Sequence, residues 1–147
     1  LHLSIRRQRQ MCIRDRDFSN CDIEHGKSIL NTNEQVLLKA TIKNRQILEQ
    51  AKKELFKDKL NHTKIGQLLS NHHSVLRDLL KVSTDKIDKM IRASLDAGAL
   101  GAKINGSGGG GCMFAYAPDN PSNIVNAIKR SGGSAVIING EDGVRMD

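Results

Sequence analysis

The chain has 147 residues, 38% of them hydrophobic, and a formal net charge of +7. This length suffices for one domain with one core, and no apolar run approaches the roughly 18 residues that a membrane helix needs. Cys12, Cys21 and Cys112 form no C-x-x-C pair, which argues against a disulfide framework or a zinc site. The composition therefore predicts a soluble, cytoplasmic protein with no membrane partner.

The positive charge is concentrated at the N-terminus. Residues 1–16, LHLSIRRQRQMCIRDR, contain five arginines and one aspartate, so they contribute +4 and leave +3 for the other residues. So weak a remaining charge gives no support for a nucleic-acid partner. The segment lacks the apolar region of a secretory signal. Three explanations stay possible: a mitochondrial presequence, a genuine basic arm, or translated read-through of a sequencing adapter. We favour read-through, expect residues 1–16 to be non-native or disordered, and place the domain at 17–147.

Three helices are predicted between Glu34 and Gly98. Apolar residues recur at helical spacing over 34–57 and again over 65–80, where Thr63 is expected to cap the second helix. A third helix is expected to open at Ser83 and to end at Gly98, because glycine commonly follows the last helical residue. Lysines and glutamates fill the opposite face of the first helix.

The periodicity changes after the third helix. A short strand is predicted over 102–105 and a second over 112–117, followed by a helix that starts at Pro121 and by a last strand over 135–138. The order helix, strand, strand, helix, strand is that of a ferredoxin-like βαββαβ unit without its first strand. The sequence thus predicts an α+β fold, a split βαβ sheet with additional N-terminal helices, whose missing strand is expected upstream of Glu34.

The stretch GAKINGSGGGGC, residues 101–112, joins the two adjacent strands. It matches G-x-G-x-x-G, but a dinucleotide-binding fold needs a helix directly after the glycines and an acidic residue about 20 positions on. Here a strand follows and position 131 is serine. The loop ends Gly111–Cys112 without the Lys-Ser/Thr of a P-loop, and no protein-kinase motif follows it. Consecutive glycine amides can form a concave nest for anionic oxygen, which we favour over a flexible hairpin tip.

Together with the preceding HHSVLRDLLKVSTDKIDKMIRASLDAGAL, this loop resembles the C-terminal domain of the GHMP kinases over about 63–117. That family includes galactokinase, homoserine kinase and mevalonate kinase, and the third helix looks most similar to galactokinase-type sugar kinases. The resemblance implies that the loop packs beside the nucleotide phosphates and the acceptor. By position the cofactor-binding residues would be Gly106, Ser107, Gly108, Gly109, Gly110 and Gly111.

Two neighbouring residues are candidates for substrate contacts. Lys103 could reach toward phosphate as a point charge, although a solvated lysine on a strand is an equal alternative. Asn105 stands where many members of the family have threonine, which weakens a hydroxyl-based role in positioning the acceptor. Among other residues, His72 is expected to be a packing histidine, and Cys112 to be a small buried side chain.

The resemblance implies an ATP-dependent kinase that phosphorylates a hydroxyl of a sugar or other alcohol. ATP and Mg²⁺ would be held mainly by an N-terminal domain that this chain lacks, and we identify no catalytic base or metal ligand here. The chain is therefore expected to be an inactive fragment. Alternatives are a mevalonate-kinase-like or other GHMP kinase, and a stand-alone ferredoxin-like module that binds an anionic ligand. An RNA-binding sheet is disfavoured because it would need more stacking aromatics than Phe114 and Tyr116.

Overall fold

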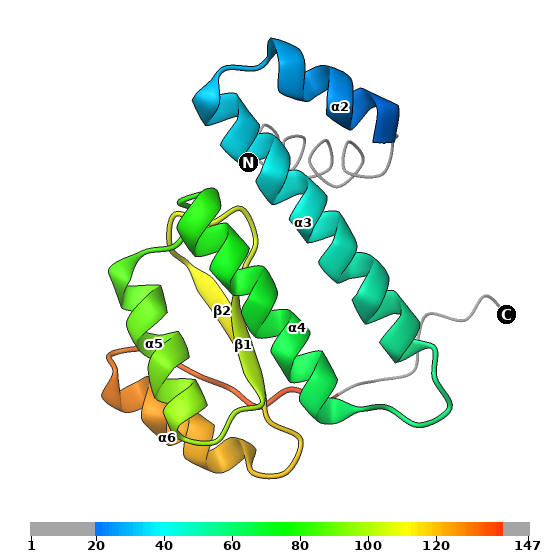
Figure 1. The fold of residues 1–147 in the computed structure, drawn as a ribbon. Coiled ribbons are helices and arrows are strands. Elements are labelled where there is room, and N and C mark those ends of the chain that lie inside the picture. The colour runs from blue at the N-terminus through cyan, green and yellow to red at the C-terminus, as the bar shows by residue number, and fades with distance from the viewer. Residues whose placement is uncertain (1–19, 140–147) are drawn as a thin grey trace, which may run out of the picture.

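The structure is a computed structural model that describes residues 20–139. The expectation for residues 1–16 therefore lies outside the described residues. Figure 1 shows long helices at one side of a small sheet and shorter helices at the other. The elements in chain order are α2 (Asn20–Ile29), α3 (Thr32–Leu55), α4 (His62–Ser74), the π-helical turn η1 (Val75–Leu79), α5 (Asp85–Asp96), β1 (Gly101–Asn105), β2 (Cys112–Tyr116) and α6 (Pro121–Arg130).

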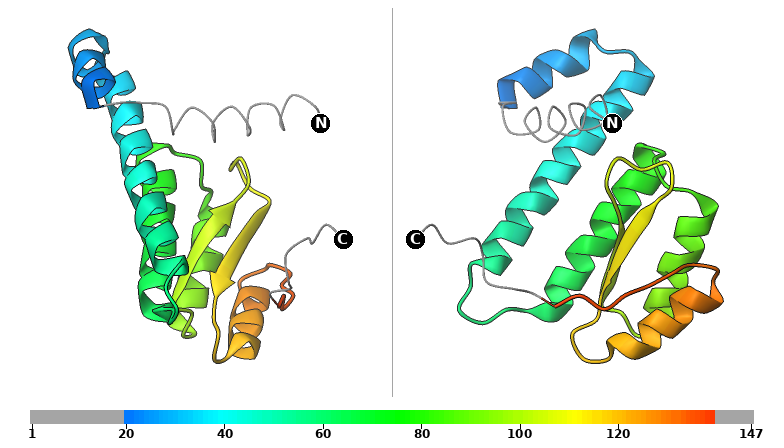
Figure 2. Two further views of the ribbon diagram at one scale, coloured as in Figure 1. Left: turned by 90° about the vertical axis from the view of Figure 1, so that its right-hand side faces the viewer. Right: turned by 180° about the vertical axis from the view of Figure 1, so that it is seen from behind.

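The sheet is an antiparallel hairpin between two layers of helices. Gly101 pairs with Tyr116 at one end of the ladder and Asn105 pairs with Cys112 at the other, next to the glycine-rich loop. Helix α4 packs against β1, and α3 packs outside α4. Helices α5 and α6 pack together on the opposite face; the left view of Figure 2 shows α3 and α6 on opposite sides of the strands.

The core lies between the hairpin and the α5–α6 layer. Because alternate residues of a strand point to opposite faces, Ala102 and Ile104 of β1 reach this layer together, and Ile104 is only 1% exposed. They pack against apolar side chains spaced along one face of α5 and one face of α6, as the sequence pattern predicted. These helix residues are Ile87, Met90, Ile91, Ile124 and Ile128.

Two glycines bring α4 into direct backbone contact with the start of β1. A Cβ added to Gly66 would lie within 3.0 Å of the Leu100 carbonyl oxygen, and one added to Gly101 would lie equally close to the Gly66 carbonyl oxygen. Only residues without a side chain permit this approach, and the protein interior has no slack to accommodate another carbon atom. The contact fixes where β1 starts relative to α4.

The helix caps differ in part from those expected. Asn61, not Thr63, caps α4, because its side-chain oxygen accepts a hydrogen bond from the Lys64 N–H at 2.9 Å. The prediction for Thr63 is therefore wrong by two residues. At the end of α5, Gly98 has φ +102° and follows the last helical residues, as predicted.

The fold class α+β is confirmed, but the sheet of the described residues contains two strands rather than three. The strand predicted over 135–138 is wrong: this segment is not assigned to a strand, and Val136 and Ile138 are 84% and 80% exposed. A strand needs a neighbour to satisfy its backbone groups, and within residues 20–139 β2 pairs only with β1. Upstream of Glu34, the described residues 20–29 form α2 instead of a strand.

Candidate functional site

The glycine-rich loop between β1 and β2 takes a backbone conformation that other residues rarely adopt. All of its glycines have positive φ angles, between +77° and +124°: Gly106, Gly108, Gly109, Gly110 and Gly111. A side chain at such angles collides with its own backbone. The glycines are therefore required by the course of the chain, and a hairpin tip of ordinary turn type would need only one or two of them.

The loop is fastened to the rest of the domain at Val82, in the segment between η1 and α5. The Gly109 N–H donates to the Val82 carbonyl oxygen at 2.8 Å. Gly108 lies directly on the same residue, since a Cβ there would stand 2.5 Å from both the Val82 Cβ and its carbonyl oxygen. The loop thus has one packed glycine and one engaged amide.

The other loop glycines face open space. A Cβ on Gly106, Gly109, Gly110 or Gly111 would meet no other atom within 4 Å. Packing among residues 20–139 therefore gives no reason to exclude side chains at these positions. The Gly109 amide is occupied by Val82, so in this conformation the amides left for an anion are those of the remaining loop residues, Ser107 included.

The two candidate substrate residues lie in β1 before the loop. Lys103 is half-buried, and its ammonium donates to the Ile104 carbonyl oxygen at 2.8 Å and lies 5.3 Å from the centre of the Phe114 ring. Burial lowers the pKa of Lys103. Its charge is thus held inside the domain rather than extended toward the loop. Asn105 is exposed at the end of β1, where the loop begins.

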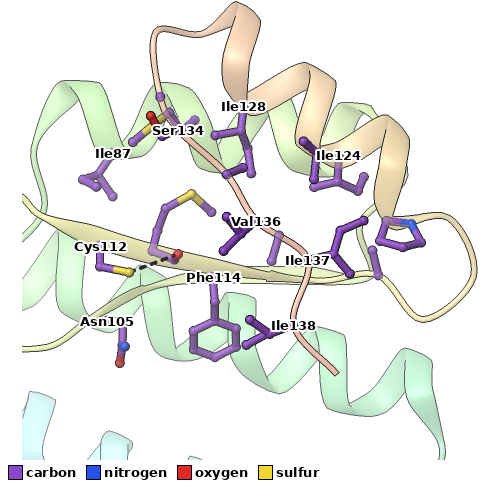
Figure 3. Close-up of a pocket in the computed structure, with 18 of the residues that line it drawn as sticks. Ile87, Asn105, Cys112, Phe114, Ile124, Ile128, Ser134, Val136, Ile137 and Ile138 are labelled. Carbon is purple, nitrogen blue, oxygen red and sulfur yellow. Dashed lines mark hydrogen bonds between the residues drawn. The ribbon is translucent and has the colours of Figure 1, made fainter. Parts of the chain in front are cut away.

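A groove of about 1080 Å³ runs from the loop along β2. Its loop end is lined by Asn105, Gly110 and Gly111, and the remainder is mostly apolar. Figure 3 shows Val136, Ile137 and Ile138 running between β2 and α6, with Phe114 on the strand beside Ile138. Within residues 20–139, β2 has β1 as its only neighbouring strand.

Cys112 lies at the loop end of this groove and is exposed, so the expectation of a small buried side chain is wrong. Its thiol lies 3.6 Å from the Met113 carbonyl oxygen (Figure 3). The physical reason is its register: Cys112 pairs with Asn105 at the last position of the ladder, where the hairpin opens into the loop.

A polar cluster behind the loop was not recognised as a unit from the sequence. His73 of α4 is only 3% exposed, and its Nε2 lies 3.1 Å from Oδ1 of Asp88 in α5. The Ser83 hydroxyl donates to the same Asp88 oxygen at 2.5 Å. Burial lowers the pKa of His73, and the adjacent Asp88 carboxylate opposes that effect. The apolar stripe read from the sequence included His72 but not His73, and the partner of His73, 15 residues away, is visible only in the fold.

The neighbouring His72 is half-buried on α4. Burial, followed by the nearby charge of Lys103, lowers the pKa of His72 to about 4. At neutral pH this histidine is therefore uncharged, as suits a residue packed beside the sheet.

The part of the chain that the structure describes has neither a cluster for a metal ion nor a membrane-spanning helix. No group of three or more histidine, cysteine, aspartate or glutamate side chains is arranged to hold a metal ion in residues 20–139. No helix in that range has both the length and the apolarity to cross a membrane.

This α+β domain, with five positive-φ glycines in its hairpin loop, matches a class of kinase C-terminal domains. The family model for the C-terminal part of the GHMP kinases matches residues 45–134, which include α4, both strands, the loop and α6. The chain belongs to the GHMP kinase family. This confirms the resemblance drawn from the loop and the helices before it.

Relatives with assigned activities include two kinds of GHMP kinase. The chain is 41% identical over 106 residues to the mevalonate kinase of Thermococcus gammatolerans, a match that covers 69% of this chain and 31% of that protein. It is 34% identical over 74 residues to the galactokinase of Mycobacterium bovis, covering 50% of this chain and 20% of the galactokinase. The chain thus spans about a third of the length of the mevalonate kinases it matches.

Solved structures give the same two kinds of kinase. Galactokinase of Lactococcus lactis in complex with galactose superposes with a TM-score of 0.66 at 26% identity, covering 87% of this chain and 34% of the galactokinase. Mevalonate kinase of L. major in complex with R-mevalonate superposes with a TM-score of 0.61 at 23% identity, covering 78% of this chain and 35% of that chain. The latter likeness is one of fold.

Proposed function

We propose that this chain is the C-terminal part of an ATP-dependent kinase that transfers a phosphoryl group to a hydroxyl of a small molecule. The single observation that carries the proposal is the set of loop glycines whose Cβ positions are open. Because no other atom of the described residues fills the space at those Cβ positions, that space is left for a ligand. Membership of the GHMP kinase family supports a nucleotide phosphate as that ligand.

The loop would act by its backbone rather than by side-chain chemistry. Phosphoryl transfer depends chiefly on positioning and on neutralising negative charge. Loop amides at Gly106, Ser107, Gly108, Gly110 and Gly111 are not engaged by Val82, and the four glycines among them add no side chain that would obstruct phosphate oxygens. They would fix and partly neutralise the phosphates. Asn105, at the end of β1, stays a candidate for contacts with the acceptor, as does Lys103, in the middle of β1, if its ammonium leaves the Ile104 carbonyl oxygen.

Mg²⁺ belongs to the same proposal but does not fit the described part of this chain. No group of three or more histidine, cysteine, aspartate or glutamate side chains in residues 20–139 is placed to hold a metal ion by itself. ATP would bring the transferable phosphoryl group, and the metal would be bound by other parts of a longer kinase. The chain supplies one wall of the site, and we expect no turnover from this wall alone.

Mevalonate is the acceptor that we favour. The mevalonate kinase of T. gammatolerans shares 41% identity with this chain, compared with 34% for the galactokinase of M. bovis. A sugar acceptor, which the form of the third helix suggested, is the second candidate, supported by the TM-score of 0.66 with L. lactis galactokinase.

The experiment has two arms. The chain alone, with ATP, Mg²⁺ and either mevalonate or galactose, should give no ADP release above background. A longer polypeptide that contains this chain after an N-terminal kinase domain should phosphorylate mevalonate and discriminate against galactose. Turnover by the repurified chain alone would overturn the fragment proposal, and preference for galactose would overturn the proposed acceptor. Specific binding of an anion by the chain alone, together with an inactive longer polypeptide, would favour a regulatory module.

A further inference from the structure

The glycine-rich loop is hydrogen-bonded to a short segment that lies outside the regular helices. Val82, which receives the Gly109 amide, lies between the end of η1 and the start of α5. The preceding Lys81 has φ +54°, an unfavourable conformation for a residue with a side chain. The Val82 N–H donates to the Leu76 carbonyl oxygen at 3.1 Å, which ties one side of the residue to η1. The orientation of the Val82 carbonyl still depends on what holds the residue that follows.

That following residue, Ser83, is fixed by a carboxylate. Its hydroxyl donates to Asp88 Oδ1 at 2.5 Å, across the first turn of α5. A hydrogen bond to a charged acceptor is stronger than one between neutral groups, typically by a factor of about two. The Ser83–Asp88 contact therefore sets the entry of the chain into α5, one residue after Val82.

Asp88 is itself fixed from the other side of the domain. The same Oδ1 lies 3.1 Å from Nε2 of His73, a side chain of α4 that is almost fully buried. A carboxylate can only accept, so the neutral His73 carries its proton on Nε2 and leaves Nδ1 bare. His73 Nδ1 is buried with no partner among the described residues, which suits an unprotonated nitrogen better than an N–H donor.

We propose that Asp88 is a positioning residue for the glycine-rich loop. It connects the buried His73 of α4 to Ser83, and through Ser83 it holds the Val82 carbonyl that receives the Gly109 amide. The arrangement gives the loop one fixed point from which the free amides on either side are oriented. Its catalytic meaning rests on the proposed phosphate-binding function of the loop, whereas the connection itself is a property of this chain without nucleotide.

The test is the hydrogen exchange rate of the Gly109 amide, measured by NMR on this chain without nucleotide. Exchange of a single amide reports how often its hydrogen bond opens. In Ser83→Ala and in Asp88→Ala we expect exchange at Gly109 to accelerate by about tenfold or more. Exchange at Leu100, whose amide donates to the Tyr116 carbonyl oxygen at 2.8 Å, should change much less.

Two matched variants separate positioning from a general loss of stability. Ser83→Thr keeps the hydroxyl and should leave Gly109 exchange near its original rate. Asp85→Ala also removes a carboxylate from the first turn of α5, but from an exposed position, and should leave it unchanged. Unaltered Gly109 exchange in Ser83→Ala would overturn the proposal, as would equal acceleration at Gly109 and Leu100. Ser83→Ala keeps the test decisive if Asp88→Ala does not fold.

The same variants distinguish this inference from the proposed function. In a complete kinase that carries this domain, Ser83→Ala should lower kcat/KM, and Ser83→Thr should restore it. Accelerated Gly109 exchange with unaltered kcat/KM would leave the positioning role of Asp88 intact and count against phosphate binding by the loop. Unaltered exchange would remove the positioning role whatever the kinetics show.

Discussion

Two groups of glycines in this domain have different surroundings. At Gly66 and Gly101, a Cβ would collide with the backbone of the neighbouring element. At Gly106, Gly109 and Gly110, a Cβ would meet nothing within 4 Å, and yet the backbone has positive φ. The first group is explained by the contact between α4 and β1. In the second group the glycines are required by the backbone angles, but no other described residue fills the space beside them, which is why we assign that space to a ligand.

The largest expected effect lies in the packed group. Gly101→Ala places a carbon within 3.0 Å of the Gly66 carbonyl oxygen, and neither backbone segment can move without separating α4 from β1. We expect the free energy of unfolding to fall by about 3 kcal/mol, the upper range for overpacking. Urea denaturation monitored by circular dichroism measures this loss.

The matched control for that variant is Gly98→Ala, after α5. Gly98 has φ +102° but open space around its Cβ position, so only the backbone penalty of about 1 kcal/mol applies. Equal losses in the two variants would show that α4 and β1 are not packed as tightly as their glycines indicate.

The free energy of unfolding should also decrease in acid, because α4 carries two histidines whose pKa values are lowered by burial. The folded-state pKa of His72, about 4, lies below the usual value of 6.5. Between these values the unfolded chain binds the proton and the folded chain does not, so stability is complete above pH 6.5 and falls as the pH decreases. The slope for one such group is about 1.4 kcal/mol per pH unit. His73, whose pKa is also lowered, adds to it in the same direction.

Unfolding free energies at pH 7.5, 6.5 and 5.0 test this. The window stays above the pKa values of ordinary carboxyl groups, so histidine dominates the change. We expect a loss of about 2 kcal/mol between pH 6.5 and 5.0, reduced in His72→Gln. A flat profile, or one unchanged by that substitution, would contradict the burial of the α4 histidines against the sheet.

The smallest expected effect concerns Lys81, the residue before the loop anchor. Within residues 20–139 it is the one non-glycine residue with positive φ. Lys81→Gly removes a strain of about 1–2 kcal/mol but increases the entropy of the unfolded chain by an amount worth about 0.5–1 kcal/mol. A net stabilisation of about 0.5 kcal/mol should raise the midpoint of thermal unfolding, while Lys86→Gly in the exposed face of α5 should lower it. Destabilisation by Lys81→Gly would mean that the lysine side chain makes a compensating contact.

Local patterns were enough to predict α3, α4, α5 and α6, the hairpin and the loop, but not α2. The apolar stripe of α5, the change of period at Gly101 and the run of glycines each depend on residues close together in sequence. Failures occurred where the structure depends on distant partners. The segment 135–138 has strand composition but no neighbouring strand in the described residues. Cysteine is a residue type common in protein cores, but Cys112 is exposed because it occupies the last position of the β1–β2 ladder, next to the loop.

The sequence was enough to recognise the glycine-rich loop as a candidate site, but not the contacts that hold the loop and its neighbours in place. A run of glycines indicates an unusual backbone conformation in any fold, so the loop could be recognised before its conformation was known. The anchor at Val82 could not be recognised, because a backbone carbonyl leaves no mark on the sequence. The position of Lys103 was likewise hidden, since its contacts with the Ile104 carbonyl and the Phe114 ring depend on strand pairing.

The most direct test of the ligand-facing loop compares Gly109→Val with Gly98→Val in a complete kinase that carries this domain. Both glycines have positive φ and open Cβ positions, so the two variants should lose similar amounts of stability in a thermal melt. Only Gly109 lies in the loop. We predict that kcat/KM falls about a hundredfold in Gly109→Val, or roughly 2.7 kcal/mol of transition-state stabilisation, and stays within about threefold in Gly98→Val. Near-normal kcat/KM in a folded Gly109→Val protein would contradict the assignment of the loop to the phosphate site.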